Sequence, residues 1–551
     1  MAWPYHFMDL NPAEKQLRRE ALDRYALFAQ LSAVVPVVLG MLYRVAKSTL
    51  KSRSKNAYSS VPNPSLKNRD SGGWSSTVRK ARWWLGEEMA PGKPMGTRDQ
   101  WVVGLSWVVW LLVLSVVGTG QDYLHFTKRL GIVAASQYPV QYLLALKSLN
   151  PFAYALGSTH ERVNKYHRVL GRVIVLLLTL HAILYFNFFI QSNLLAKRMT
   201  SPIVRAGFVS FVLTHILNGS AQRPLRALSY RLFFAIHLFV AFATPALLCI
   251  HAPPARPFFL QALLVFLADL LTRKLDTTRA TAVLTALPTT NLIQIVASLP
   301  TPTKLSRFRA RPGAHIYLSL PASSPAALFA FLFNPFTVAA VDPAARTVTL
   351  VARHRAGPMT SALAAAAPAG KRFPLAIEGP YGVAARFPRL VGGGYDRVLL
   401  VAGGIGATFT VPLYRALAEE GGAVKTEMVW VVRGRGEVAW AEAEADGLIE
   451  DENVRVFVTG GGGASEVASG VEMGTLGRRR SNGAAPGREA VQRGRPDLKR
   501  IVDEVFRGGA DERVAVLVCG PEAMAREIRG HVGVWARKGR DVWWHNEGFG
   551  F

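Results

Sequence analysis

Two apolar segments that each start and end with a histidine constrain this chain more than any other feature. One runs from His167 to His181 and the other from His237 to His251, and the histidines of each pair are fourteen positions apart. In an α-helix, fourteen steps end within roughly 40° of four full turns, so both imidazoles share one helix face, about 21 Å apart along the axis. Ionisable side chains inside apolar spans are costly, and four at matched spacing indicate a ligand-binding role.

Two such helices side by side would hold one imidazole pair near each face of a membrane. An iron porphyrin leaves two axial positions open, and each imidazole pair could fill them. The spacing therefore predicts two stacked haems, with haem iron as the only metal. A single histidine in an apolar helix is more often a core or interfacial residue, and we interpret His125, His160 and His215 in that way.

Composition favours a membrane protein over a soluble one. Half of the residues are hydrophobic, and the net charge of +28 comes from basic residues that cluster beside apolar segments. Such clustering is typical of cytosolic loops next to a lipid bilayer, and it argues against nucleic-acid binding. Apolar segments lie near 25–45, 101–119, 130–146, 168–190, 203–218, 232–250 and 257–272, which predicts about seven transmembrane helices.

The stretch between the first two spans sets the expected topology. A short N-terminal tail, 1–24, and a first span, 25–45, precede residues 46–100, which carry eleven Lys and Arg against four Asp and Glu. We expect 46–100 to be a largely disordered cytosolic loop. Its Trp83–Trp84 pair is expected either at the membrane interface or in a cluster of loop aromatics.

This topology orders the four histidines within a haem-binding domain at about 101–275. With 46–100 inside, the helices of His167 and His237 run parallel from the cytosolic to the outer face. His167 and His237 are then the inner pair, and His181 and His251 the outer pair.

The second half of the chain has the pattern of two soluble domains. Short β-like runs broken by Pro and Gly predict an antiparallel barrel at about 283–390. Alternating strands and helices predict an α/β nucleotide-binding domain at 395–551. Residues 460–495 are rich in Gly, Ala, Ser and Arg, and we interpret them as a flexible insertion with no assigned function.

Several short motifs stand at the ends of predicted strands. Gly403-Gly404-Ile405-Gly406 follows an apolar strand and opens a helix, so its backbone N–H groups could approach a pyrophosphate. Asn334-Pro335-Phe336-Thr337 could hold an isoalloxazine ring, and Gly357-Pro358-Met359-Thr360 could present N–H groups to flavin phosphates. Taken singly, the glycine motif is a weak signal because glycine turns are common, and each of the other two motifs is equally compatible with an ordinary turn.

Taken together and in order, these motifs resemble those of a known family. The two H-x13-H helices, N-P-F-T, G-x-M-T, G-P-Y-G, G-G-I-G-A-T and C-G-P are similar to the fungal ferric reductases of the NADPH oxidase superfamily over about residues 100–551. The resemblance implies a haem-containing membrane domain fused to a ferredoxin-reductase-like module that binds FAD and NADPH. The seven-span layout also resembles the ferric reductases, whereas animal NADPH oxidases have six spans.

The resemblance implies a role for each matching residue. The haem ligands would be His167, His181, His237 and His251. The FAD site would include Asn334, Pro335, Phe336, Thr337, Gly357, Thr360 and Phe551, with Asn334 standing where the family usually has His. The NADPH site would include Gly379, Pro380, Tyr381, Gly382, Gly403, Gly404, Gly406, Arg433, Arg435, Cys519, Gly520 and Pro521, with Arg433 or Arg435 on the 2′-phosphate.

The expected function is electron transfer across a membrane, from NADPH to FAD, to the inner haem, to the outer haem and on to a ferric or cupric chelate. An alternative keeps the cofactors and uses dioxygen as the acceptor, which gives superoxide. A third hypothesis is a cofactor-free membrane scaffold, and the four matched histidines argue against it. Short outer loops at about 191–202 and 252–256 favour a bulky chelate. The expected location is the plasma membrane or an internal membrane, with the FAD and NADPH module in the cytosol.

Overall fold

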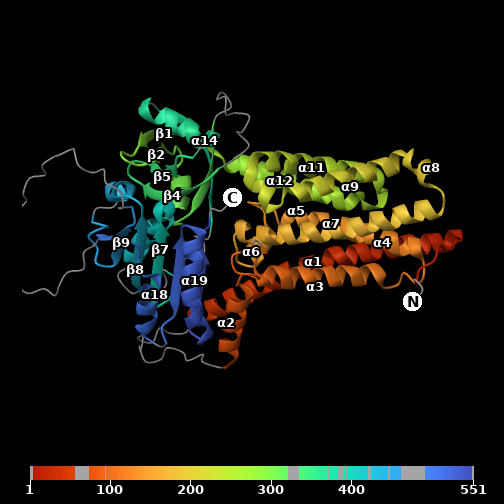
Figure 1. Cartoon of the computed structure of the whole chain (residues 1–551), viewed down its shortest axis with the longest axis horizontal. Helices are drawn as coiled ribbons and strands as arrows, with labels where there is room; N and C mark the ends of the chain where they lie inside the picture. Colours follow the sequence, from red (N-terminus) through yellow and green to blue (C-terminus); the bar gives the residue numbers. More distant parts are fainter. Residues whose placement is uncertain are drawn as a thin grey trace, which may run out of the picture. The chain divides into compact units, whose positions relative to one another are not determined.

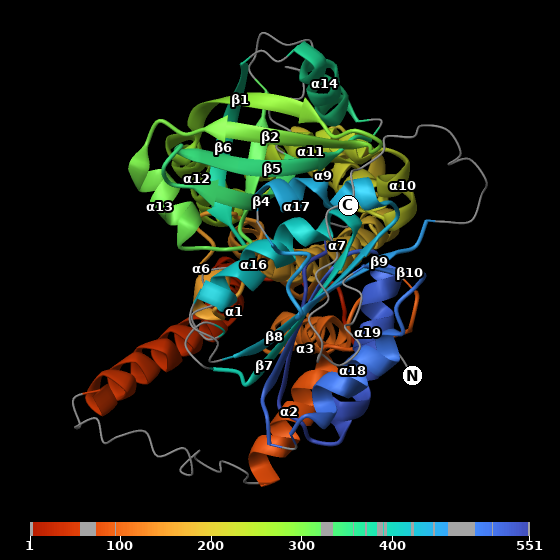
Figure 2. The same cartoon turned by 90° about the vertical axis from the view of Figure 1, so that its left-hand side faces the viewer.

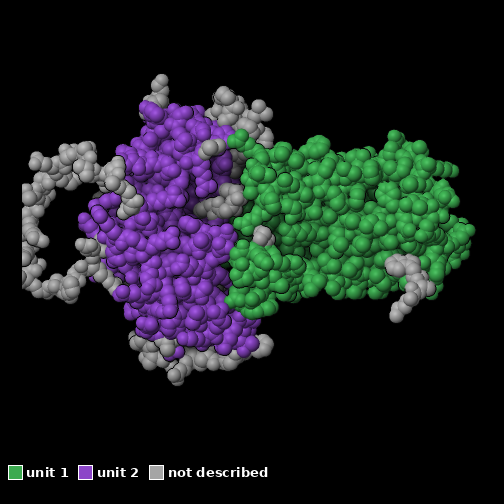
Figure 3. All heavy atoms as spheres, viewed as in Figure 1, with its two compact units in different colours: residues 1–70, 84–275, 551 green, residues 71–83, 276–550 purple. Residues whose placement is uncertain are grey.

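The computed structural model divides into two compact units, which are described separately (Figure 3). Unit 1 is built from residues 1–70 and 84–275, and unit 2 from residues 71–83 and 276–550. The structure describes residues 4–55, 73–93, 95–320, 334–355, 357–369, 372–382, 390, 394–419, 424–444, 447–460, 491–509 and 511–548.

Unit 1 is a bundle of helices (Figure 1). Its helices are α1 Pro12–Lys55, α3 Arg98–Val116, α4 Tyr123–Ala135, α5 Tyr138–Leu143, α6 Pro151–Ala155, α7 His160–Gln191, α8 Leu195–Met199, α9 Pro202–Ser220, α10 Arg223–Leu228, α11 Tyr230–His251, η1 Pro253–Ala255 and α12 Arg256–Asp276. Six stretches of the described chain are helical, long and apolar enough to cross a membrane: Pro12–Ala46, Arg98–Val116, His160–Gln191, Pro202–Ser220, Tyr230–His251 and Pro253–Asp276. Residues 12–24, which we had expected to be a tail, are part of α1.

Local sequence signals place the ends of the two histidine-bearing helices. The side chain of Thr159 caps the start of α7 by accepting a hydrogen bond from the Arg162 N–H, and Ser229 caps α11 in the same way through Leu232. Helix α11 ends at His251, two residues before the first of two consecutive prolines. Each histidine pair therefore lies within one helix, and α11 continues through Pro245 between His237 and His251.

The predicted span at 130–146 is not one helix, which corrects that expectation. It starts earlier, at Tyr123, and is divided into α4 and α5 at Ser136 and Gln137. Pro139 lacks the N–H that would continue the hydrogen-bond ladder, which accounts for the break. Together, α4 and α5 run antiparallel to α7, because Thr127 and Gln141 lie beside His181 and His167.

The stretch 46–100 is more ordered than expected. Helix α1 continues to Lys55, residues 56–72 lie outside the described chain, and residues 73–85 form helix α2, Gly73–Leu85. Trp83 of α2 is buried in unit 2, where its ring meets Trp544 at 6.4 Å and lies 4.7 Å from the Arg529 guanidinium. Trp83 therefore lies neither at the membrane interface nor in a cluster of loop aromatics, and both expectations were wrong for it. Its side chain is part of the hydrophobic core of the α/β domain. Trp84 is exposed, with the Arg98 guanidinium 4.9 Å from its ring.

The first part of unit 2 is a closed antiparallel barrel, which confirms the predicted fold class (Figure 2). Its strands are β1 Thr278–Ala286, β2 Leu292–Ser298, β3 His315–Ser319, β4 Asn334–Asp342, β5 Thr347–Arg353 and β6 Phe373–Tyr381, in the order β1-β2-β5-β4-β3-β6. Helix α13, Pro302–Arg309, precedes β3, and helices α14, Pro358–Ala366, and η3, Ala367–Ala369, precede β6. Alternate residues of β1 are buried, as a barrel wall requires. The barrel begins at Thr278, five residues before the expected boundary at 283.

The second part of unit 2 is a parallel six-stranded sheet with helices on both faces. The strands are β7 Arg397–Gly403, β8 Lys425–Val432, β9 Val454–Val458, β10 Val491–Arg493, β11 Val514–Cys519 and β12 Val542–Asn546, in the order β10-β9-β8-β7-β11-β12. The helices are η5 Gly404–Gly406, α16 Ala407–Glu419, η6 Arg435–Val438, α17 Ala439–Glu444, α18 Leu498–Arg507 and α19 Glu522–Arg537. The insertion expected at 460–495 is shorter, because β10 pairs with β9; residues 461–490 lie outside the described chain.

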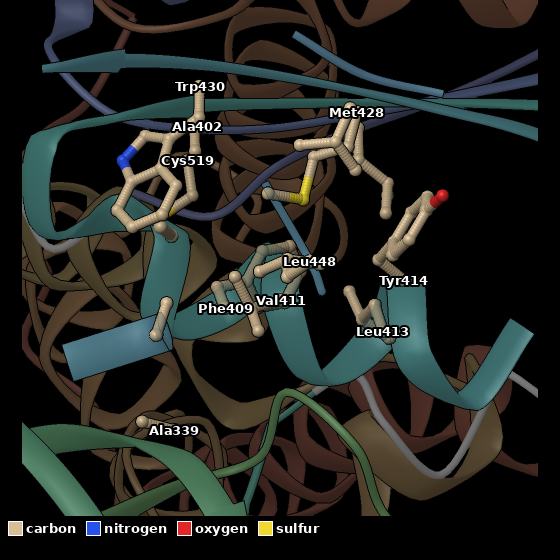
Figure 4. Packing of buried hydrophobic residues seen from close by; sticks show 14 of the residues in the cluster. Ala339, Ala402, Phe409, Val411, Leu413, Tyr414, Met428, Trp430, Leu448 and Cys519 are labelled. Carbon is tan, nitrogen blue, oxygen red and sulfur yellow. The ribbon is translucent and has the colours of Figure 1, made fainter. Parts of the chain in front are cut away.

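Helix α16 covers one face of the sheet and joins it to the barrel. Phe409 of α16 packs near Met428 and Trp430 of β8, and Ala339 of the barrel belongs to the same buried cluster (Figure 4). The opposite face is covered by α18, α19 and Trp83 of α2. Residues 71–83, some 190 residues before the barrel in the chain, thus complete the second core of unit 2.

Replacing Trp83 by Ala should lower the free energy of unfolding of unit 2 by about 3 kcal/mol, because the buried indole leaves a cavity. The measurement is thermal unfolding of the full-length protein in detergent with a thiol-reactive dye, in a Cys249→Ser background. Cys519 is buried in the sheet and then reports unfolding. Trp84→Ala is the matched control and should change the midpoint little, since Trp84 is exposed. Equal midpoints for the two variants would contradict the assigned role of Trp83.

Candidate functional site

The four histidines at matched spacing lie in two facing pairs between α7 and α11. The ring centroids of His167 and His237 are 6.0 Å apart, and those of His181 and His251 are 6.3 Å apart. Metal–imidazole nitrogen bonds are about 2 Å long, so two imidazoles on opposite sides of one ion hold their centroids about 6 Å apart. Both pairs therefore have the separation that axial ligation of a haem iron requires.

Backbone carbonyls orient three of the four imidazoles through Nδ1. The carbonyl oxygen of Gln141 lies 2.9 Å from Nδ1 of His167, and that of Thr127 lies 2.8 Å from Nδ1 of His181. Nδ1 of His251 is 3.0 Å from the Ile203 carbonyl. A hydrogen bond from Nδ1–H to a carbonyl fixes the tautomer that leaves Nε2 free to bind a metal.

The carbonyl partners of His167 and His181 come from one antiparallel pass. Thr127 on α4 and Gln141 on α5 are fourteen residues apart, which matches the spacing of the two histidines on α7. Nδ1 of His237 is buried and has no hydrogen-bond partner among the described residues. Sequence reasoning did not find these carbonyl contacts, because a backbone acceptor carries no residue-type signal.

Two glycines make room for the imidazoles of the His181–His251 pair. A Cβ on Gly131 of α4 would lie 2.7 Å from the His181 ring. A Cβ on Gly207 of α9 would overlap the ring of His251. Glycine inside an apolar helix is a recognised sign of close approach, so these positions were visible in the sequence but had no assigned partner.

Two of the histidines interpreted as structural have protein partners. Nε2 of His215 lies 3.0 Å from the Thr179 hydroxyl, and its Nδ1 lies 2.8 Å from the Phe211 carbonyl. Nε2 of His125 lies 2.8 Å from the guanidinium of Arg129, which is fully buried. Both imidazoles are thereby used in helix packing, and both lie apart from the four-histidine set.

In unit 2, one predicted flavin motif, N-P-F-T, and one predicted NADPH motif, G-P-Y-G, lie together in the barrel. Thr337 at the start of β4 and Tyr381 at the end of β6 both pair with His315 of β3. Neighbouring strands are about 4.8 Å apart, so N-P-F-T and G-P-Y-G flank a single strand. Arg353 ends β5 at a rim of the barrel, and its guanidinium donates a hydrogen bond to Glu437 of the α/β domain at 3.1 Å.

The G-x-M-T motif forms the start of α14. Gly357 is the N-cap residue, and the Thr360 hydroxyl donates a hydrogen bond to the Arg355 carbonyl at 2.6 Å. This contact closes the turn that leads into the helix. The N–H groups of the first helical turn, next to the exposed Arg355, favour an anion there.

The glycine motifs of the α/β domain meet at the carboxyl end of the sheet. Strands β7 and β11 are neighbours, with Ala402 paired to Cys519, so the turns that follow them face each other. A Cβ on Gly403 would lie 2.5 Å from the Pro521 ring, and one on Gly406 would overlap the Cys519 carbonyl. Only glycine permits this close approach, and such an edge is where open α/β sheets bind nucleotides. Burial raises the pKa of the Cys519 thiol, which keeps it neutral.

Arg433 and Arg435 follow β8 at the same edge of the sheet. Both are exposed, and among the described residues neither guanidinium has an assigned side-chain partner. They are therefore accessible to a ligand lying across the β7 and β8 ends. Phe551, the other predicted flavin contact, lies outside the described residues.

Comparison with known proteins shows which domains and relatives the chain resembles. The family "Ferric reductase like transmembrane component" matches residues 130–248, and the family "Ferric reductase NAD binding domain" matches residues 395–532. A probable metalloreductase, AIM14, of Scheffersomyces stipitis is 20% identical over 86% of this chain and 89% of its own length. The ferric/cupric reductase transmembrane component 2 of Schizosaccharomyces pombe is 23% identical over 76% of this chain and 80% of its own length.

Among solved structures, a ferredoxin NADP+ reductase from Neisseria gonorrhoeae, solved with bound FAD and NADP, aligns with 49% of this chain and 98% of its own. It has 12% identity and a TM-score of 0.34.

A polytopic helical domain, an antiparallel barrel and an NAD-binding sheet together define a transmembrane NAD(P)H-dependent reductase. The chain contains a ferric reductase like transmembrane domain and a ferric reductase NAD binding domain, and it is similar to fungal proteins named metalloreductases and ferric/cupric reductases. This confirms the family that the sequence motifs indicated. The chain is an oxidoreductase and an integral membrane protein.

Proposed function

We propose that this protein uses NADPH to reduce a ferric or cupric chelate on the opposite side of a membrane, through FAD and two haems. The observation that carries the proposal is the pair of facing imidazoles at each end of α7 and α11, with centroids 6.0 and 6.3 Å apart. When bound, the flavin accepts a hydride and the haems carry single electrons. The chain's own residues position these groups and exclude water.

The four histidines and their neighbours would hold the haems in position. His167 and His237 would bind one haem at one end of the bundle, and His181 and His251 would bind the other haem at the opposite end. The carbonyls of Gln141, Thr127 and Ile203 engage Nδ1 of His167, His181 and His251, so Nε2 of each would be the atom that binds iron. Nε2 of His167 lies 3.4 Å from the side-chain nitrogen of Gln141, which would have to turn away when haem binds. The glycines at 131 and 207 let the imidazoles lie against α4 and α9.

The residues of unit 2 would bind the flavin and the nucleotide. Asn334, Pro335, Phe336 and Thr337 would line the flavin ring, and Gly357 with Thr360 would hold its pyrophosphate at the start of α14. Gly379 to Gly382, Gly403 to Gly406 and Cys519 to Pro521 would form the wall of the NADPH site. The contact of Arg353 with Glu437 connects the barrel rim to the nucleotide edge, which would bring nicotinamide to the flavin.

The likeness to proteins named ferric/cupric reductases favours a metal chelate as the acceptor. The soluble module faces the cytosol in this proposal, since the basic residues of 46–100 disfavour translocation. The protein resides in the plasma membrane or an internal membrane. Dioxygen is the competing acceptor, and it is distinguished by experiment.

The function is tested with purified protein in lipid nanodiscs under anaerobic conditions. NADPH should reduce a haem signal and then a ferric or cupric chelate, with two chelates reduced for each NADPH because a hydride carries two electrons. In air without chelate, superoxide should account for a small share of the NADPH consumed. Superoxide in stoichiometric amounts, with no anaerobic chelate reduction, would identify an oxidase instead.

Replacing Gly207 by Ala should remove about half of the bound haem, because the added methyl group would displace the His251 imidazole that would hold one haem iron. Haem per protein is measured by the pyridine haemochrome assay. Gly219→Ala on the same helix is the matched control, since nothing lies within 4 Å of a Cβ there. Equal haem content in both variants would contradict the assignment of His251.

The double replacement of Arg433 and Arg435 by Ala should raise KM for NADPH by roughly 10- to 100-fold, because charge-assisted hydrogen bonds to the 2′-phosphate are lost. KM for NADH should stay nearly constant, and the ratio of the two constants is the quantity to measure. Arg507→Ala, another exposed arginine of unit 2, should leave both constants unchanged. Equal increases in KM for NADPH and NADH would show that the two arginines do not bind the 2′-phosphate.

A further inference from the structure

The N-terminal segment lies across the end of unit 1 that carries His181. The N–H of His6 donates a hydrogen bond to the Gln121 carbonyl at 2.8 Å, and the N–H of Tyr123 donates to the His6 carbonyl at 3.0 Å. The Tyr5 ring stacks on Phe126 at 4.8 Å. The backbone on both sides of His6 is thereby held against the start of α4.

A pocket of about 380 Å³ lies beside this segment. Residues 5–7 form one wall, Tyr123 of α4 a second, and Leu184, Asn187 and Gln191 of α7 a third. The three α7 residues follow His181 by three, six and ten positions, which places them about 4.5, 9 and 15 Å further along the axis. The pocket therefore begins within one helical turn of a proposed haem ligand.

The polar groups of the pocket differ in how far they are satisfied. The Tyr123 hydroxyl donates to the Leu184 carbonyl at 3.0 Å and accepts from the Asn187 amide at 2.9 Å. The Gln191 amide donates to the Asn187 side-chain oxygen at 3.0 Å. The His6 imidazole is exposed and has no assigned side-chain partner in the described part of the chain. It is the one ionisable side chain in the pocket lining besides the phenols of Tyr5 and Tyr123.

Aromatic rings lead from His181 to this pocket without interruption. The His181 ring meets Tyr185 at 5.0 Å, and Tyr185 meets Phe189 at 5.6 Å. Phe188 lies 5.9 Å from Phe189 and 5.1 Å from Phe7, which lines the pocket. A molecule in the pocket would therefore be separated from the proposed outer haem only by a few packed aromatic rings.

We propose that this pocket is where the electron acceptor binds, and that it takes a small cupric chelate whose metal is bound by the His6 imidazole. The proposal rests on the proposed function. An imidazole suits copper better than ferric iron, and Cu²⁺ binds nitrogen ligands most tightly among the divalent first-row metals. The amides of Asn187 and Gln191 hydrogen-bond the chelator's oxygens. The balance is NADPH + 2 Cu(II) giving NADP⁺ + H⁺ + 2 Cu(I), with the copper staying on its chelator.

The experiment uses the full-length, haem- and FAD-loaded protein in nanodiscs under anaerobic conditions with NADPH. Cupric nitrilotriacetate has an exchangeable position for an imidazole, whereas ferricyanide has none. His6→Ala should raise KM for the cupric chelate about 10-fold and leave ferricyanide reduction unchanged. Two controls should behave as the wild type. Met8→Ala changes the same segment outside the pocket lining, and His531→Ala removes a half-buried histidine of α19 in unit 2.

A binding measurement separates this proposal from the proposed function. The EPR spectrum of cupric nitrilotriacetate should gain a nitrogen ligand on addition of wild-type protein without NADPH, and it should not do so with His6→Ala. An unchanged KM together with an EPR spectrum insensitive to His6 overturns the pocket assignment, even if the wild-type protein is an active reductase. If NADPH reduces the haem signal but neither acceptor is reduced, the proposed function is wrong, and the EPR result still decides whether His6 binds copper.

Discussion

The hydrogen bonds from the Nδ1 atoms of three histidines to backbone carbonyls set the geometry on which the membrane unit depends. A free imidazole can rotate and can bind a metal through either nitrogen, so ligation at a defined depth needs a fixed ring. Thr127 and Gln141 supply that restraint to His181 and His167 from a single antiparallel pass. The carbonyls of α4 and α5 therefore orient the two imidazoles of α7.

The break between α4 and α5 has a consequence for this restraint. In an uninterrupted helix, each carbonyl accepts one hydrogen bond within the helix. Its second lone pair can still accept a hydrogen bond from a histidine on a neighbouring helix. Pro139 also removes the N–H that would have bound the Ala135 carbonyl. The interruption separates α4, which carries the Thr127 carbonyl, from α5, which carries the Gln141 carbonyl.

Unit 2 is organised by close backbone approach instead of by side-chain ligands. Gly403 and Gly406 allow the turn after β7 to contact the turn after β11. Arg353 and Glu437 connect the same region to the barrel rim, where Thr337 and Tyr381 flank His315. The second core, on the other face of the sheet, is completed by Trp83, whose chain neighbour Trp84 belongs to unit 1. The chain thus links the membrane and soluble units at 83–84 as well as at 275–276.

The sequence by itself determined those features that depend on local periodicity. The fourteen-residue histidine spacing, the six helices long enough to cross a membrane, the barrel and the parallel sheet all follow from helix and strand repeats that neighbouring residues define. The glycine and N-P-F-T motifs were found because turns and close approach restrict residue type. The tertiary structure alone decided which carbonyls hold the imidazoles, that Trp83 lies in the α/β core, that Val491–Arg493 extends the sheet, and that His6 lies over α7. These contacts join residues far apart in the chain, and a backbone acceptor or an exposed helix face leaves no periodic pattern that could reveal its partner.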